Sequence, residues 1–405
     1  MDQATETDVL IVGGGPVGLL LGNLLGQLGI QTVILERRPE PLMASMAIGI
    51  TPPSLEILRK IGLDKTFVRN GFPVRTAKVI EDFREVGCMS FDGLCTPYPF
   101  FLSIPQCQTR ALLFDQLKSH SSITCHTGVE FKDLEDARSS IKVRAWDYQQ
   151  RQQLKWSARY VVATDGYRSS VRAACGIPVK QYQYPQRWIM ADYPDHGECG
   201  VEARLYFGPH GSIESFPLPG GQRRWIAQSE PGMETPTEAH LHKWVEDRTG
   251  ISLDQNSHNP PSCFGAKFLI AKDFNKGRVF LCGDAAHVMS SVGGQGMNTG
   301  FADAELLTHI LHKLLESEDE HNRLAQHYKS TRLKAFHVAA NRAARGMWLG
   351  TIRGRFASAI RGQFIQHVLF SSLMKPHLAP YFAMLTIPHR NLEHTPSIDR
   401  LLITI

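Results

Sequence analysis

The chain has 405 residues, 42% hydrophobic and 20% charged, which is ordinary for a globular protein of two or three domains. Its 44 basic and 39 acidic side chains leave a formal charge of +5, too weak and dispersed to predict a nucleic-acid partner. The eight cysteines form no C-x-x-C pair, so we expect neither a metal site nor a disulfide framework, and a reducing, cytoplasmic setting is favoured. No stretch predicts a clean transmembrane span.

The first predicted unit is a strand, a glycine-rich turn and a helix. Residues 8–12 form an apolar run, and a helical pattern extends to about Leu28. The turn between them has the spacing G-x-G-x-x-G and consists of Gly13, Gly14, Gly15, Pro16, Val17 and Gly18. A second strand, 32–35, ends at Glu36, which lies 21 positions past Gly15. This spacing is typical of a dinucleotide site, with pyrophosphate at the helix N-terminus and ribose on the carboxylate, and FAD and NAD share it.

The next stretch mixes a loop, a helix and β-prone segments. Arg37 and the neighbouring Arg38 either contact the cofactor or form part of a solvated loop. A helix is predicted over 53–61 and another over 109–118. Between them, residues 75–101 are aromatic and broken by Pro and Gly, which indicates the first piece of a sheet-rich second domain.

Strand patterns return over 126–131 and 141–146, as expected for an antiparallel ribbon. Residues 159–163 form an apolar strand that is followed by Asp165. The helical turn after it carries Arg172, and the two side chains either brace each other as an ion pair or contact a cofactor.

Residues 177–272 are predicted to form the bulk of the second domain, with alternating strands separated by turns. One face of its sheet is expected to close over the cofactor. The candidate substrate contacts on these strands and turns are Arg204, Tyr206, His210 and Trp225. Each of these four side chains has the alternative of ordinary core or surface packing.

A second cofactor signal lies between residues 277 and 305. The buried strand pattern 279–282 stops at Gly283 and Asp284, and a helical pattern runs from Met297 through Leu314. The turn and helix start between them contain Gly293, Gly294, Gly296, Met297 and Asn298. Asp284 suits the hydroxyls of a ribose or polyol, and the helix N-terminus suits the negative edge of a reduced flavin. Together with Glu36, this selects non-covalent FAD.

The tail begins with a predicted helix over 323–345. Small residues then recur every fourth position, at Gly346, Gly350, Gly354, Ser358 and Gly362. Such spacing lets two backbones approach closely, so we expect the tail to pack on the cofactor domain or on a second subunit in a homodimer. Arginines at 345, 353, 355 and 361 disfavour a membrane span.

These motifs resemble the single-component FAD-dependent aromatic hydroxylases, flavoprotein monooxygenases with the para-hydroxybenzoate hydroxylase fold. The resemblance rests on Gly283-Asp284-Ala285-Ala286-His287, Gly293-Gly294-Gln295-Gly296-Met297-Asn298 and Asp165-Gly166-Tyr167-Arg168-Ser169-Ser170-Val171-Arg172. It implies that Gln106 contacts the flavin and that Asp165 lies near it. Two departures stand out: Ser290-Ser291 where the family usually carries proline, and Met46 where it commonly carries arginine.

The fold class predicted is α/β, with a Rossmann-type FAD-binding domain, an interleaved sheet-rich substrate domain and a C-terminal helical segment. The ranges expected are 1–75, 104–176 and 273–340 for the first, 76–103 and 177–272 for the second, and 341–405 for the third. The resemblance implies that NADH or NADPH reduces FAD and that O2 then forms a C4a-hydroperoxide, which hydroxylates an aromatic or polyketide-like molecule. A flavin-dependent dehydrogenase or reductase, or a catalytically silent flavin-binding protein, is the alternative.

Overall fold

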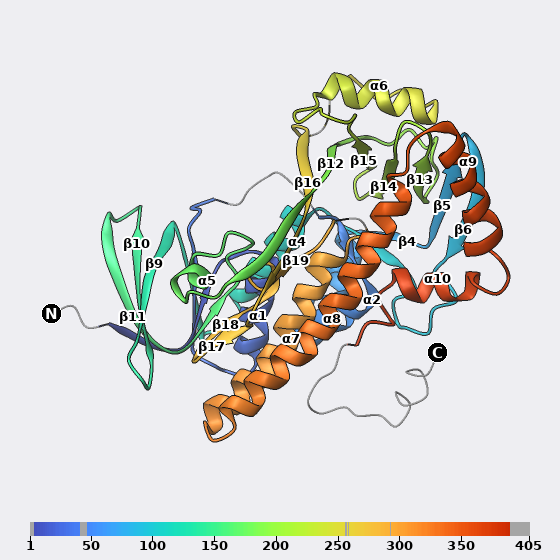
Figure 1. Cartoon of the computed structure of the whole chain (residues 1–405). Helices are drawn as coiled ribbons and strands as arrows, with labels where there is room; N and C mark the ends of the chain where they lie inside the picture. The colour runs from blue at the N-terminus through green and yellow to red at the C-terminus, as the bar shows by residue number, and fades with distance from the viewer. Residues whose placement is uncertain (1–3, 41–46, 256, 258, 292, 389–405) are drawn as a thin grey trace.

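A computed structural model of the chain describes residues 4–40, 47–255, 257, 259–291 and 293–388. Its strands form two eight-stranded sheets and one three-stranded sheet. Figure 1 shows the long helices α7 (Gln295–Glu316) and α8 (His321–Gly350) side by side, with α6 (Glu238–Thr249) beyond one end of them. The mixed α/β fold expected from the motifs is confirmed.

The first large sheet is parallel at its centre, in the order β18-β11-β1-β2-β8. Antiparallel β17 closes one edge, and antiparallel β10 and β9 extend β11 as a ribbon. Its strands are β1 (Thr5–Val12), β2 (Thr32–Glu36), β8 (Ile123–Thr127), β9 (Val129–Asp136), β10 (Ile141–Asp147), β11 (Gln152–Ala163), β17 (Asn275–Lys276) and β18 (Val279–Leu281). Because parallel strands end at one edge, the turns after β1, β2, β11 and β18 meet there.

Helices cover the faces of this sheet, which explains the continuous apolar runs in its central strands. Helix α1 packs against α4 and α7, and α7 packs against α8. The bounds of these helices and their shorter neighbours are α1 (Pro16–Gln27), α2 (Pro52–Lys60), α3 (Asp64–Asn70), α4 (Gln106–Leu117) and α5 (Ser170–Ala174). One expected strand is divided: Gly128, at φ 76°, separates β8 from β9, because a left-handed residue ends strand geometry.

The second large sheet has the order β19-β16-β12-β15-β14-β13-β5-β6 and is antiparallel except where β13 meets β5. One face packs beneath α6 through Ile189, Tyr193, Tyr206, Trp225, Leu241 and Trp244. Its strands are β5 (Thr76–Glu81), β6 (Arg84–Ser90), β12 (Val179–Pro194), β13 (Ala203–Phe207), β14 (Ile213–Leu218), β15 (Gln222–Gln228), β16 (Ser262–Ala271) and β19 (His287–Val288). The small third sheet contains β3 (Gly49–Ile50), β4 (Phe72–Val74) and β7 (Phe101–Ser103).

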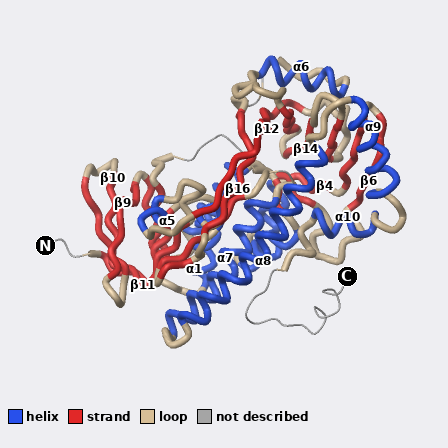
Figure 2. Tube along the Cα trace, in the orientation of Figure 1, coloured by secondary structure: helices blue, strands red, loops and turns tan. Residues whose placement is uncertain are grey.

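The C-terminal helices lie along the β5–β6 side of the second sheet (Figures 1 and 2). They are α9 (Arg355–Phe364), the π-helical turn η2 (Ile365–Leu369) and α10 (Lys375–Phe382). Arg361 pairs with Glu81 of β5 through Nη2–Oε1 and Nε–Oε2 distances of 2.7 and 2.8 Å, and both side chains are buried. Within the described residues, no helix is both long and apolar enough to cross a bilayer.

The small residues of the tail do not form one continuous ridge. The helix breaks after Gly350, and Gly354 adopts φ 91° before α9 begins. A Cβ on Gly350 would lie 3.2 Å from the Phe207 ring, and one on Gly362 would lie 3.0 Å from Glu81. The small residues therefore admit side chains of the second sheet, and α8 crosses the boundary expected between 340 and 341.

Candidate active site

The glycines of the motif after β1 have two different tasks. A Cβ on Gly13 would lie 2.5 Å from the Thr164 carbonyl oxygen, and one on Gly18 would lie 2.1 Å from the Gly13 carbonyl oxygen. These two glycines therefore allow the ends of β1 and β11 and the start of α1 to pack together. Gly15 differs, because a Cβ there would meet no protein atom within 4 Å. It lines an open cavity at the N-terminus of α1, together with Gly13, Pro16 and Val17.

Glu36 holds the turn from the next strand. Its Oε2 accepts a hydrogen bond from the Gly14 amide at 2.8 Å, and its Oε1 accepts one from the Arg38 amide at 3.0 Å. Arg110 of α4, which the sequence analysis missed, donates to the Gly14 carbonyl at 2.9 Å. Glu36, Arg37 and Arg110 all line the same cavity. The carboxylate retains acceptor capacity for ligand hydroxyls, since each of its oxygens has two lone pairs.

The second motif also borders the cavity, through Asp284 and the glycines of its turn. The Gly283 amide donates to Asp303 of α7 at 3.0 Å, which holds the turn after β18 in place. Asp303 also pairs with His287 at 2.7 Å and with Arg332 of α8 at 2.5 Å, and all three side chains are buried. Although burial opposes ionisation, the charges and hydrogen bonds of His287 and Arg332 lower the pKa of Asp303. A buried charge network therefore shapes the back of this turn.

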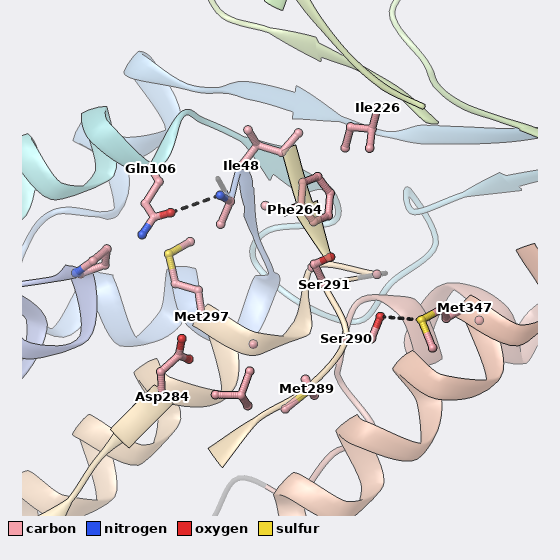
Figure 3. A pocket seen from close by; sticks show the side chains of 18 of the residues that line it. Ile48, Gln106, Ile226, Phe264, Asp284, Met289, Ser290, Ser291, Met297 and Met347 are labelled. Atoms are coloured by element: carbon pink, nitrogen blue, oxygen red, sulfur yellow. Dashed lines mark hydrogen bonds between the residues drawn. The ribbon is translucent and has the colours of Figure 1, made fainter. Parts of the chain in front are cut away.

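Asp284 extends its side chain into the cavity beside Met297 (Figure 3). Desolvation by the surrounding cavity walls raises the pKa of the Asp284 carboxyl above its ordinary value, although the side chain is exposed to the open cavity. The carboxylate has no hydrogen-bond or ion-pair partner among the described residues, and it lies at the cavity surface, where a ligand hydroxyl can reach it.

Helix α7 begins at the glycine turn. Gly294 precedes it at φ 64°, a left-handed conformation that favours glycine, and no side chain caps the helix. Gly294, Gly296 and Met297 line the cavity, so the first-turn amides are near it. Asn298 instead faces the protein: its Nδ2 donates to the carbonyls of Gly49 and Gly294, and its Oδ1 accepts from Thr51. It positions the turn, and its side chain is fully engaged.

Gln106 and Asp165 occupy the remaining walls. Gln106, at the start of α4, accepts a hydrogen bond from the Ala47 amide at 3.2 Å (Figure 3). One oxygen of Asp165 caps α5 by accepting from the Ser170 and Val171 amides. Its other oxygen is buried and has no partner among the described residues. Arg172 donates to backbone carbonyls instead, so the ion pair considered between it and Asp165 does not form.

The two departures from the family pattern have different outcomes. Ser290 is buried and directs its hydroxyl to the Met347 sulfur of α8 at 3.4 Å, whereas Ser291 is exposed at the cavity wall, below Phe264 in Figure 3. Met46 lies outside the described residues.

One cavity of about 1370 Å³ joins all these groups. Sites for single drug-sized ligands are usually about 300–1,000 Å³, so this one has room for a cofactor and a second molecule. Its far wall consists of the second sheet and the C-terminal helices. The lining residues there include Trp188, Met190, Leu205, Phe207, Phe216, Ile226, Phe264, Met347, Leu349, Phe364, Phe370 and Tyr381.

The structure corrects the expected substrate contacts. Tyr206 and Trp225 lie on the sheet face under α6, where they are 5% and 2% exposed. Arg204 shares that face and donates to the Tyr206 hydroxyl, while His210 is exposed in the turn before β14. Successive residues of a strand point to opposite faces of the sheet. On these strands, the described residues that point to the other face, including Leu205, Glu214 and Ile226, line the cavity. The alternation was visible in the sequence, but nothing there identified which face would be covered.

The residues present fit FAD on three counts. The absence of a side chain at Gly15 leaves open space beside the backbone at the N-terminus of α1, which a pyrophosphate could occupy. The Asp284 carboxylate faces the cavity without a described partner, and Asp165 also lines the cavity. The N-termini of α1 and α7 lack side-chain caps and present free amides to an anionic ligand. Of the cofactor residues predicted, Gly18, Gly283 and Asn298 serve the turns, and the others line the cavity.

Comparison with known proteins agrees with this site. The chain is 29% identical over 323 residues to 3-(3-hydroxy-phenyl)propionate/3-hydroxycinnamic acid hydroxylase 2 of Burkholderia vietnamiensis, a match that covers 75% of this chain and 56% of the relative. The chain thus spans little more than half the length of this curated relative.

Two solved structures share the fold. The p-nitrophenol 4-monooxygenase of Pseudomonas putida DLL-E4 superposes with a TM-score of 0.85 at 21% identity, over 95% of this chain and 99% of that one. A Diels-Alderase of pyrroindomycin biosynthesis gives 0.77 at 22% identity, over 93% and 80%. At these identities the likeness shows the fold alone.

The family match covers most of the chain. Residues 6–343 match the FAD binding domain family. This range contains both glycine-rich turns, Glu36, Asp165 and Asp284, and therefore every element that lines the cofactor side of the cavity. The chain belongs to this family of FAD-binding flavoproteins, the para-hydroxybenzoate hydroxylase type that its motifs resemble.

Proposed function

We propose that the protein is an FAD-dependent monooxygenase that uses NADH or NADPH and O2 to hydroxylate an aromatic or polyketide-like small molecule. The observation that carries this proposal is the single cavity in which the cofactor residues face a largely apolar wall of the second sheet. Such a wall suits a ring-bearing substrate and keeps water away from the reacting groups. The hydroxylase relative supports the same reaction class.

The chain's own residues would bind and orient the cofactor. The α1 N-terminus with Gly15 would receive the pyrophosphate, Glu36 the adenosine ribose, and Asp284 the ribityl chain. Gln106 and the amides at the start of α7 would border the flavin ring. Bound FAD supplies the redox chemistry, namely acceptance of two electrons from NADH or NADPH and their delivery to O2. We assign the FAD-binding and substrate domains the ranges expected from the sequence, except that the FAD-binding domain includes the whole of α8.

Substrate-stimulated oxidation of NADH or NADPH tests the reaction class. A panel of phenols and polyketide-like rings is expected to accelerate nicotinamide consumption, with isotope from labelled O2 recovered in the product. A dehydrogenase or reductase would turn over without incorporating oxygen, and a silent flavin-binding protein would show no stimulation. Either result across the whole panel would refute the proposal.

Asp284→Ala is expected to weaken FAD binding by about 10- to 100-fold, because a hydrogen bond to a charged acceptor is worth about 1.5–3 kcal/mol. The fold should persist, since the Asp284 carboxylate has no described protein partner to lose. Equilibrium dialysis of FAD and thermal melting of the apoprotein measure the two effects. Asp284→Asn, which keeps the shape, should retain part of the affinity. Unchanged FAD affinity in Asp284→Ala would show that Asp284 does not bind the cofactor.

We also propose a cytoplasmic homodimer formed through the C-terminal helices. Large apolar side chains are exposed on α9, namely Phe356, Ile360 and Phe364, and nearby in the chain at Trp348 of α8 and at Leu373 before α10. Light scattering on the purified protein gives the subunit number. Phe356→Asp should then convert a dimer to a monomer, and a monomeric wild type would contradict the proposal.

A further inference from the structure

The second sheet presents one row of side chains across its strands to the cavity. Glu214 of β14 is paired in register with Leu205 of β13 and with Ile226 of β15. The row continues to Val79 of β5 on one side and to Met190 of β12 on the other. All five residues line the cavity. Among the described residues of the second sheet that line the cavity, Glu214 is the only one with a charged side chain.

Glu214 has no role in holding the protein together. Its carboxyl forms no hydrogen bond or ion pair with any described residue, whereas the neighbouring acids of the same sheet are paired: Asp192 with Arg224, and Glu81 with Arg361. The elements that contact β14 from the third sheet contribute the apolar Val74 and Phe101 to the cavity.

Desolvation in this setting raises the pKa of Glu214 to about 7. No other cause contributes, which agrees with the absence of a described partner. An unpaired carboxyl group in an apolar wall has an energetic cost, and a replacement by leucine or methionine would remove that cost. A ligand group that pairs with the carboxyl would offset it.

We propose that Glu214 is a specificity-determining residue that anchors a hydroxyl or amino group of the ring-bearing substrate and excludes a carboxylate at the same position. This inference rests on the proposed function, because it assigns the substrate class of the same cavity. A hydroxyl group both donates and accepts, so it pairs with the carboxyl in either protonation state. A substrate carboxylate would place like charges together in a poorly solvated site, which disfavours binding.

Four fused-ring probes of matched shape test the proposal: naphthalene, naphthol, naphthylamine and naphthoate. Each is titrated into the FAD-loaded protein without NADH or NADPH, and binding is followed by the change in flavin absorbance and in probe fluorescence. Wild type is expected to bind naphthol and naphthylamine about 10- to 100-fold more tightly than naphthalene, and naphthoate most weakly.

Two substitutions separate the hydrogen bond from the charge. Glu214→Leu should remove the preference for naphthol over naphthalene. Glu214→Gln should keep much of that preference, since an amide still donates and accepts, but it should admit naphthoate. Neither variant should lower the melting temperature, because the carboxyl has no described protein partner to lose.

Two control variants accompany them. Phe216→Leu changes the next cavity-facing side chain of β14 and should shift all four affinities together. Glu198→Gln removes an exposed charge outside the described cavity lining and should leave the affinities unchanged.

The proposal is overturned if wild type shows no preference for naphthol over naphthalene, binds none of the probes, or prefers naphthoate. It is also overturned if Glu214→Leu keeps the wild-type order. Because binding is measured without turnover, a protein that shows the expected order but incorporates no oxygen would refute the monooxygenase assignment alone. A protein that hydroxylates rings with no effect of Glu214 would refute this inference alone.

Discussion

Gly15→Val is expected to abolish retention of FAD while the protein stays folded. The backbone of Gly15 is extended, with φ −77° and ψ 175°, a conformation that valine adopts readily. An added Cβ would meet no protein atom within 4 Å, so the branches would project into the cavity at the N-terminus of α1. There they would displace the pyrophosphate from the backbone amides.

The affinity for FAD is expected to fall by about 100-fold or more, because charge-assisted hydrogen bonds from the backbone amides, worth about 1.5–3 kcal/mol each, would be lost. Flavin absorbance per mole of purified protein and circular dichroism of the same sample measure occupancy and folding. Gly93→Val is the matched control, because Gly93 is an exposed glycine outside the described cavity lining whose Cβ would also meet nothing. Gly18→Val should instead fail to fold, as its Cβ would overlap the Gly13 carbonyl. Full FAD occupancy in Gly15→Val would show that the nucleotide does not bind at this turn.

Asp303→Asn is expected to destabilise the protein by about 3–5 kcal/mol, because it leaves the buried Arg332 guanidinium without its counter-charge. The substitution also weakens the hydrogen bonds of this side chain with the Gly283 amide and with His287, so the turn that carries Asp284 should become less ordered. Urea denaturation at neutral pH measures the loss, and FAD affinity should fall with it. Glu320→Gln removes a charge from an exposed ion pair with Arg323 and should cost less than about 1 kcal/mol.

The stability contributed by Asp303 should depend on pH in one direction. The pKa of this carboxyl is lowered in the folded state, so its contribution is fully present above the unfolded-state pKa, near 3.9. It is lost as pH falls toward the folded-state value. The difference between wild type and Asp303→Asn should therefore be constant above about pH 5 and shrink in stronger acid. A difference that grows in acid would contradict the assignment of Asp303 as an ionised group.

Local patterns were sufficient for the cofactor side of the cavity. A glycine turn between a strand and a helix has few conformations, and in a parallel sheet such turns meet at one edge. The spacing of Gly15, Glu36 and Asp284 therefore predicted residues that the fold brings to one cavity. Asn298 shows the limit of this reasoning, because a helix-start residue can serve the turn rather than the ligand.

The substrate side could not be read in the same way. Alternation along β13, β14 and β15 shows two faces, but only packing decides which face is covered by α6 and which faces the cavity. Arg204, Tyr206 and Trp225, the three candidates on strands, point to one face of the sheet and therefore lie together on the face away from the cavity. Leu205, Glu214 and Ile226, which point to the other face, line the cavity instead.

By itself, the sequence determined the fold class, the two flavin motifs and the residues that end the central strands, because these depend on contacts within short stretches of chain. The tertiary structure alone decided the register of the second sheet, the Asp303 network and the closure of the cavity by residues such as Phe370 of the tail. Several of these contacts join distant segments, such as β5 with β13 and β12 with β16, and such long-range packing leaves no periodic signal in either segment.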